Sequence, residues 1–390
     1  MAPLIRRLLP ALAAVGLIVL ATGPAAGALP FSRTPGAPRA IPVGAAVGGP
    51  ELATHGVMVH PAPGVPALPA DLPSSSWLVA DVGTGAVLAA RDPHGRYLPA
   101  STLKVLTAIT LIPRLNPNRV VVPSFADVSV DGSKVGLVDT MGYTVRLLFT
   151  TLLVVSGNDA ANTLADAAGG IRKTLALMNQ KARELQADDT VALTPSGLDA
   201  PGESSSAYDL ALIARAGLAM PAFRHYIAII SSTVPAPGKK HFQIYTHNWL
   251  LTDYPGAIGV KNGYTVAAQG TYIGAATRGG RTLLVTMMHA NPLLFPEARA
   301  LLDWGFAADG RVQPAGVLVD PLGSGAPANT QPGAAAAPLR ADRAASGRRP
   351  ATSTGLALPG GVLAASTAVV TVVTRRRRRR YRSRLRLPRI

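Results

Sequence analysis

Apolar residues alternate with polar ones, or recur at helical spacing, along most of residues 77–306. Two pairs of short apolar segments are joined by glycine-containing turns, and each pair predicts a β-hairpin. The first hairpin comprises residues 77–82 and 86–90, and the second comprises residues 270–277 and 281–289. A further strand is expected from residue 259 onward. Strands are therefore predicted at both ends of this region.

The stretch between the two hairpins is dominated by apolar residues at helical spacing. Helices are expected at residues 105–109, 144–153, 160–168, 171–185 and 206–219, and a closing helix at residues 296–306. Residues 120–138 resemble short β-strands separated by turns. If the strands at the two ends pair, they form an antiparallel sheet flanked by helices, and the inner helices form an all-helical subdomain. This is an α+β fold.

The N-terminus has the three-part pattern of a secretory signal peptide. Two arginines precede an apolar run over residues 8–21, and small residues around Ala26 and Ala28 supply a cleavage site. We expect a signal peptide at residues 1–28. A linker rich in proline, glycine and alanine is expected at residues 29–70, ahead of a catalytic domain at residues 71–321.

The C-terminal part predicts a membrane anchor. A second Pro/Ala/Gly-rich linker is expected at residues 322–353, and residues 354–374 carry no charge and are long enough to cross a bilayer. Ten of the last sixteen residues (375–390) are arginines, which mark this tail as cytoplasmic. We therefore predict a single-pass protein of the cell membrane whose catalytic domain lies on the extracytoplasmic side.

The net charge gives no evidence for a nucleic-acid partner. The formal charge is +17, and removing the ten tail arginines leaves +7 for the rest of the chain. The positive charge is thus concentrated in the tail, where it suits anionic lipid head groups. The chain has no cysteine, which excludes thiol catalysis and cysteine-ligated zinc. Its histidines show no metal-binding spacing, so no metal or other cofactor is predicted.

The first candidate for chemistry is Ser101-Thr102-Leu103-Lys104, which follows Pro99 and precedes an apolar helix. Residues at i and i+3 are neighbours on one helix face, so the Ser101 hydroxyl and the Lys104 amine can act as nucleophile and base. Taken alone, the pattern is short, and a helix-capping serine beside a surface lysine explains it equally well.

Two further motifs follow in order, Ser156-Gly157-Asn158 and Lys261-Asn262-Gly263. Each is weak by itself, since the first can be a helix-capping turn and the second an Asn-Gly hairpin turn. Those separate explanations do not account for the shared order. S-x-x-K, S-x-N and K-x-G in this order are typical of penicillin-binding proteins and class A β-lactamases.

The sequence most resembles the serine D-alanyl-D-alanine carboxypeptidases, the low-molecular-mass penicillin-binding proteins of the actinobacterial membrane-anchored kind. Further stretches support the resemblance, namely residues 143–148, 156–161, 196–199, 207–210 and 259–265. It implies a β-lactamase/DD-peptidase-like fold. It also implies removal of the terminal D-alanine from peptidoglycan stem pentapeptides through an acyl-enzyme, without a cofactor, and acylation by β-lactam antibiotics.

The resemblance also implies roles for individual residues. Ser101 would be the nucleophile, Lys104 its base, and Ser156 the relay that protonates the departing D-alanine. The remaining residues would bind substrate: Asn158 holds the peptide carbonyl and the Lys104 amine, and Lys261 pairs with the terminal carboxylate. Asn262, Gly263 and Tyr264 complete the substrate-binding set, with the backbone N–H groups of Ser101 and Tyr264 forming the oxyanion hole.

Other functions remain open at this point. Asn262 departs from the Thr or Ser usual at the middle of the third motif, which leaves room for a non-catalytic wall-binding protein on the same fold. A β-lactamase needs a second base, but neither Glu184 nor Glu203 lies in the expected E-x-x-x-N pattern. An endopeptidase that cuts cross-links is a further alternative.

Overall fold

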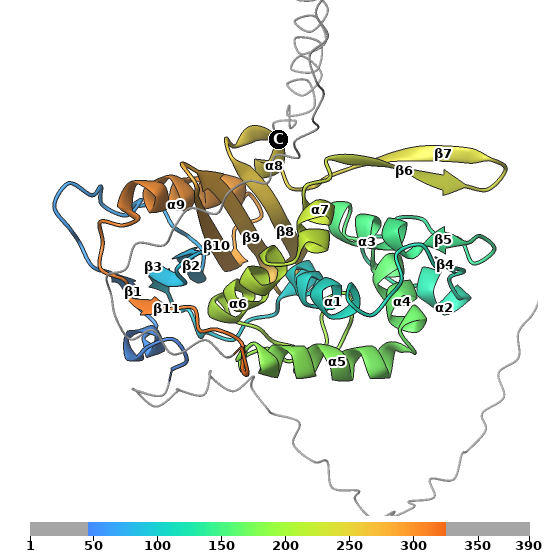
Figure 1. Cartoon of the computed structure of the whole chain (residues 1–390), viewed down its shortest axis with the longest axis horizontal. Coiled ribbons are helices and arrows are strands. Elements are labelled where there is room, and N and C mark those ends of the chain that lie inside the picture. The colour runs from blue at the N-terminus through green and yellow to red at the C-terminus, as the bar shows by residue number, and fades with distance from the viewer. Residues whose placement is uncertain (1–45, 325–390) are drawn as a thin grey trace, which may run out of the picture. The chain divides into compact units, whose positions relative to one another are not determined.

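A computed structural model describes residues 46–324, whose arrangement is shown in Figure 1. A seven-stranded sheet has the order β1-β3-β2-β10-β9-β8, with β11 also paired to β3. Its strands are β1 (Val57–Val59), β2 (Ser76–Asp81), β3 (Ala86–Arg91), β8 (Ala257–Thr265), β9 (Gln269–Arg278), β10 (Arg281–Ala290) and β11 (Gly316–Val317). Both predicted hairpins are confirmed, and β2 pairs antiparallel with β10. The expected α+β fold is present.

Helices cover both faces of this sheet (Figure 1). Helix α9 (Phe295–Ala308) lies on one face. Helix α6 (Ala207–Leu218) lies on the other face, together with the rest of the helical region. That region contains α1 (Lys104–Leu111), α2 (Phe125–Val128), α3 (Val145–Val154), α4 (Asn158–Ala167), α5 (Ile171–Glu184) and α7 (Pro221–Ile227). Strand β2 is buried along its whole length because it lies between the two layers.

Alternate residues of β2 divide between two apolar cores, as the period of a strand requires. Leu78 and Ala80 belong to the core shared with the helical region, whereas Trp77 and Val79 belong to the core under α9. Short polar residues begin several helices. The Ser206 hydroxyl, for example, accepts the N–H of Asp209 at the start of α6.

Two stretches differ from the sequence-based expectation. Residues 120–138 contain only the short strand β4 (Val120–Val121), which pairs with β5 (Tyr143–Thr144), and the helical turn α2. A capping box between Ser124 and Asp127 stabilises that turn. The second stretch is a hairpin of β6 (Ser231–Ala236) and β7 (Lys240–Tyr245), which the sequence analysis did not predict.

The expected linker over residues 29–70 is wrong from residue 46 onward. A 3₁₀ turn, η1 (Pro50–Ala53), buries Leu52, and β1 adds to the edge of the sheet beside β3. These residues join the fold because they pair with β3 and pack against its core. The two ends of the folded body also meet, since the Val317 N–H donates to the Gly48 carbonyl over 2.8 Å.

Several predicted segments lie outside the described residues. These are the signal peptide (1–28), the early part of the first linker, the second linker from residue 325, the membrane span (354–374) and the arginine-rich tail (375–390). Within residues 46–324, no helix combines the length and the apolar character needed to cross a bilayer.

Candidate active site

Ser101 and Lys104 lie where the 3₁₀ turn η2 (Ala100–Leu103) continues into α1. Side chains three residues apart eclipse one another in such a turn. The Lys104 Nζ is accordingly 2.9 Å from the Ser101 Oγ. The predicted nucleophile and base are therefore in direct hydrogen-bond contact.

The residues around Ser101 are fixed from two sides. The Thr271 hydroxyl of β9 donates to the Pro99 carbonyl over 2.9 Å. Ala100 has a φ of 46°, which non-glycine residues seldom adopt. Gly197 packs against this residue so closely that a Cβ there would lie 1.8 Å from the Ala100 carbonyl oxygen. Only glycine fits at position 197, and the turn that carries Ser101 is held in a strained conformation.

Lys104 Nζ has three oxygen partners. Besides Ser101 Oγ, they are Asn158 Oδ1 at 2.7 Å and the Ser196 carbonyl at 2.6 Å. A neutral amine has two N–H bonds and one lone pair. If Asn158 and Ser196 accept the two N–H bonds, the lone pair is directed at the Ser101 hydroxyl. The geometry thus suits a base that removes the Ser101 proton.

Electrostatics favour the neutral amine. Lys104 is fully buried, and this desolvation, together with the charge of Lys261, lowers its pKa well below the ordinary lysine value. Burial also lowers the pKa of Lys261 to about 7. Burial thus disfavours the charged form of both lysines, and the charge of Lys261 adds to this effect at Lys104.

The second motif lies in the loop between α3 and α4. Ser156 has a φ of 63°, and its buried Oγ has no hydrogen-bond partner among the described residues. Asn158 begins α4 and is held by its Nδ2, which donates to the Asp131 carbonyl over 2.7 Å. Asp159 accepts the N–H groups of residues 135–137, so it supports the loop rather than the chemistry.

The third motif lies on β8, which is an edge strand of the sheet within the described residues. Lys261 and Gly263 are buried, Asn262 is half-buried, and Tyr264 is exposed. A Cβ at Gly263 would lie 2.6 Å from the Ser101 nitrogen, so β8 passes directly beside Ser101. Strand β8 thus forms one wall of the site, and all three motifs meet there.

A loop at residues 193–199 completes the site, and sequence reasoning assigned it no role. Its Ser196 carbonyl binds Lys104, and its Pro195 carbonyl accepts the Thr107 hydroxyl over 2.7 Å. At the other end, the Thr265 hydroxyl donates to Asp199 Oδ1 over 2.7 Å and ties the loop to the end of β8. The only signal was the stretch at residues 196–199, which supported the family resemblance.

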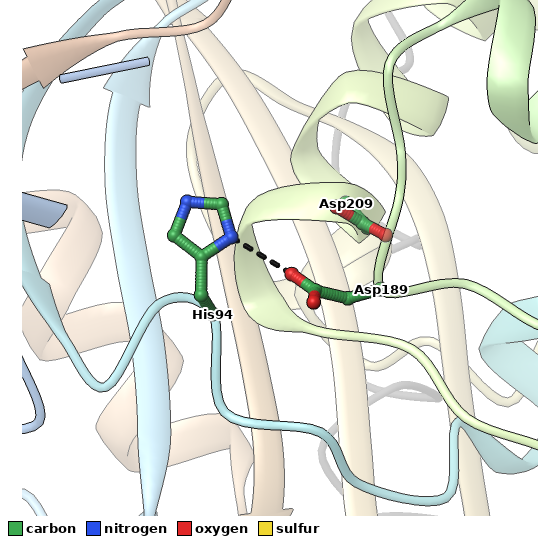
Figure 2. A group of neighbouring side chains, drawn as sticks. All are labelled: His94, Asp189 and Asp209. Atoms are coloured by element: carbon green, nitrogen blue, oxygen red, sulfur yellow. Dashed lines mark hydrogen bonds and ion pairs between the residues drawn. The ribbon is translucent and has the colours of Figure 1, made fainter. Parts of the chain in front are cut away.

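A second titratable cluster, His94, Asp189 and Asp209, is drawn in Figure 2. Its potential ligand atoms lie within 4.8 Å of one another, as in a metal site. However, His94 Nδ1 is 2.8 Å from Asp189 Oδ2, and His94 Nε2 is 3.0 Å from the Val47 carbonyl. An oxygen acceptor at each ring nitrogen indicates an imidazolium, which has no lone pair for a metal. We therefore interpret the cluster as a buried ion pair.

The comparisons with known proteins agree with this geometry. The chain matches a family model described as D-alanyl-D-alanine carboxypeptidase over residues 63–292. That range is more than half of the chain and contains all three motifs. The chain belongs to the D-alanyl-D-alanine carboxypeptidase family. The resemblance inferred from the motifs is confirmed.

Within the D-alanyl-D-alanine carboxypeptidase family, DacB2 of Mycobacterium tuberculosis is 46% identical over 256 residues, which cover 64% of this chain and 87% of the relative. DacD of Escherichia coli is 34% identical over 253 residues, covering 61% of this chain and 64% of the relative.

Solved structures of this family share the fold. A D-alanyl-D-alanine carboxypeptidase from Mycobacterium tuberculosis aligns with a TM-score of 0.62 and 43% identity, covering 67% of this chain and 99% of that one. A variant of the Streptomyces K15 DD-transpeptidase aligns with a TM-score of 0.58 and 27% identity, covering 61% and 100%.

Proposed function

We propose that this chain is a serine D-alanyl-D-alanine carboxypeptidase that removes the terminal D-alanine from peptidoglycan stem pentapeptides. The observation that carries the proposal is the 2.9 Å contact between the buried Lys104 Nζ and the Ser101 Oγ, in a chain of this family. Burial, together with the charge of Lys261, lowers the pKa of Lys104 and so favours the neutral amine that can accept the Ser101 proton.

In the proposed acylation step, Ser101 Oγ attacks the carbonyl carbon of the penultimate D-alanine while its proton moves to Lys104 Nζ. The peptide C–N bond then breaks as Ser156 passes its proton to the departing D-alanine nitrogen and takes a replacement proton from Lys104, which becomes neutral again. An ester between Ser101 and the remaining peptide results. Water hydrolyses this ester, Lys104 accepts a proton from the water, and Ser101 regains its hydrogen.

Strand β8 holds the substrate in this proposal. A peptide laid along the free edge of a sheet gains backbone hydrogen bonds. Lys261 then attracts the terminal carboxylate, with Asn262 as a neutral amide donor beside it. Because β8 passes close to the Ser101 nitrogen at Gly263, the N–H groups of Ser101 and Tyr264 can share the oxyanion.

The decisive experiment incubates the purified full-length chain with a D-Ala-D-Ala-terminated pentapeptide and measures released D-alanine. We expect release by the wild type and none by Ser101→Ala. No release by a folded wild type, or unchanged release by Ser101→Ala, would contradict the assignment. Labelled penicillin separates an enzyme from a wall-binding protein, since only an enzyme forms the covalent adduct.

The structure disfavours the β-lactamase alternative. Glu203 is buried, and its carboxylate accepts the N–H groups of Leu193 and Thr194. Glu184 pairs with Lys181 on α5. Both carboxylates have other hydrogen-bond or ion-pair partners, so we expect neither to activate water at Ser101 and the penicillin adduct to be long-lived. A cross-linked muropeptide dimer as substrate would identify endopeptidase activity.

The location that we propose is extracytoplasmic, with a single membrane span at residues 354–374. Support comes from the sequence alone: an N-terminal pattern typical of a secretory signal, and an uncharged span followed by the arginines of residues 375–390. Membrane fractionation of the full chain, compared with a chain that ends at residue 353, tests this anchor.

A further inference from the structure

The Ser196 carbonyl is one of the two acceptors that orient the Lys104 amine, and Asn158 is the other. Asn158 is a side chain within a known motif, but Ser196 acts through its backbone. Its carbonyl can point at Lys104 only if the loop at residues 193–199 keeps one conformation. Whatever holds this loop therefore controls the direction of the Lys104 lone pair.

Glu203 holds the start of the loop. It is 4% exposed, and its Oε2 accepts the N–H groups of Leu193 at 2.9 Å and Thr194 at 2.8 Å. The same carboxylate oxygen is 3.1 Å from the Thr194 hydroxyl. A buried carboxylate that receives several donors is a firm anchor, because each lost bond leaves a buried polar group without a partner.

Thr194 connects Glu203 to the turn that follows. Its Oγ1 accepts the N–H of Gly197 over 2.8 Å, which closes the turn that carries the Ser196 carbonyl. Gly197 in turn packs against the Ala100 carbonyl, one residue before the nucleophile. A continuous set of contacts thus runs from Glu203 through Thr194 to both Lys104 and Ser101.

We propose that Glu203 is a positioning residue for acylation, which fixes the residue 193–197 turn so that the Ser196 carbonyl directs the Lys104 lone pair at Ser101. The proposal rests on the proposed function, in which Lys104 is the base. Glu203 does not touch the reacting atoms and acts through Thr194 and Ser196.

Glu203 has a second, electrostatic effect. Its negative charge raises the pKa of Lys104, and so opposes the larger lowering by burial and by Lys261. Removing this charge should let Lys104 lose its proton at a lower pH. Substitutions can therefore separate the two effects of Glu203. Loss of the turn conformation should lower the acylation rate, whereas loss of the charge should shift the acidic limb of the pH profile.

The experiment measures the rate of penicillin acylation against pH for the full-length chain and three variants. Glu203→Gln keeps an oxygen for the two N–H groups, so we expect a rate within a few-fold of wild type and an acidic limb shifted down by about half a pH unit or more. Glu203→Ala should show the same shift and a loss of at least about tenfold in rate. Thr194→Val retains the charge, so we expect a slower rate without the downward shift.

The matched control is Ser204→Ala, which removes a 2.9 Å hydrogen bond to the Asp189 carbonyl from the same segment but lies outside the contacts to Lys104. It should keep the wild-type profile. Rates are expressed per folded molecule, and Thr194→Val tests the turn if Glu203→Ala does not fold.

The possible failures can be told apart. Wild-type rates and pH profiles in all three variants, with a wild-type chain that is acylated, would overturn the role of Glu203 alone. Acylation of the wild type without release of D-alanine would overturn the proposed carboxypeptidase activity. The acylation rates of the Glu203 variants could still be interpreted in that case. A wild-type chain that does neither contradicts both.

Discussion

Two buried clusters of titratable side chains in this fold have opposite electrostatic character. Around Ser101, the lysines Lys104 and Lys261 are buried near each other, and both have lowered pKa values. In the other cluster (Figure 2), His94 lies against Asp189, and opposite charges compensate. Burial disfavours the charged form in both clusters. At Lys104 a second cation adds to this effect, whereas at His94 and Asp189 the opposite charges outweigh it.

The pKa values of the second cluster follow from its partners. Burial lowers the pKa of His94, but the hydrogen bond and charge of Asp189 outweigh it, so the net shift is upward. Burial raises the pKa of Asp189, yet His94 and Arg96 bring it below its usual value. Asp209 lacks such a partner, and burial followed by the charge of Asp189 raises its pKa to about 8. This cluster therefore stabilises the fold rather than performing chemistry.

The largest effect that we expect comes from Lys104→Met, which keeps the length of the side chain and removes the amine. Penicillin acylation should fall by about 10²–10⁴-fold, the usual contribution of a general base. Thermal stability should change little, because burying the amine was itself unfavourable. Stopped-flow acylation and thermal melts measure the two effects. Lys181→Met, at a half-buried residue of α5 that pairs with Glu184, is the control and should acylate normally.

The second effect concerns stability instead of catalysis. Asp189→Asn removes the charge that holds both His94 and Arg96, and leaves a buried imidazolium without its counter-ion. We expect the free energy of unfolding to drop by about 3–5 kcal/mol, as when one member of a buried pair is removed. Denaturant titration measures it. A loss of acylation at unchanged stability would show that this cluster belongs to the active site.

The third effect is a pH dependence of opposite sign in the two clusters. The pKa of His94 is higher in the folded chain than its unfolded value near 6.5. Its stabilisation is therefore complete below about pH 6.5 and is lost as pH rises through the folded pKa. Acylation should instead rise with pH as Lys104 loses its proton.

Thermal melts of wild type and His94→Gln between pH 5 and 9 test this third effect. The difference in melting temperature should be largest at the acid end and shrink towards the alkaline end. A difference that grows with pH would mean that His94 is neutral in the folded chain, and the interpretation as an ion pair would fail.

The smallest effect is expected at Asn262. Asn262→Thr restores the residue usual in the third motif, and both side chains can donate one hydrogen bond to a carboxylate. Exchanging one neutral donor for another should change kcat/KM for the pentapeptide by no more than about 1 kcal/mol, which is roughly fivefold. A change above tenfold would show that Asn262 sets substrate preference.

Sequence patterns predicted the fold well where local signals were strong. Glycine-containing turns between apolar segments marked the two hairpins of the sheet, and the three motifs placed Ser101, Lys104 and Lys261 in one site. The hairpin of β6 and β7 was missed because Pro235 and Pro237 interrupt its pattern, although the bonds between its strands tolerate proline at an edge. Strand β1 is too short to carry any periodic signal.

The site was predicted incompletely for a different reason. Motifs report side chains, whereas the third partner of Lys104 is the backbone carbonyl of Ser196, which every residue type possesses. Glu203 was examined only as a possible second base, and its contacts to Leu193 and Thr194 could not be read from spacing. Such contacts depend on how a loop folds back on itself, which one sequence does not reveal.

The contact between Gly48 and Val317 has a consequence for how the three motifs should be regarded. Because the two ends of the folded body lie side by side, the chain follows an almost closed ring through the fold. In a circularly permuted chain, the present ends of the folded body would be joined and new ends opened at Gly238, at the tip of the β6–β7 hairpin. The third motif would then come first in the sequence, and its neighbours in space would be unchanged. The chemistry requires only that the three motifs meet in space, whatever their order along the chain.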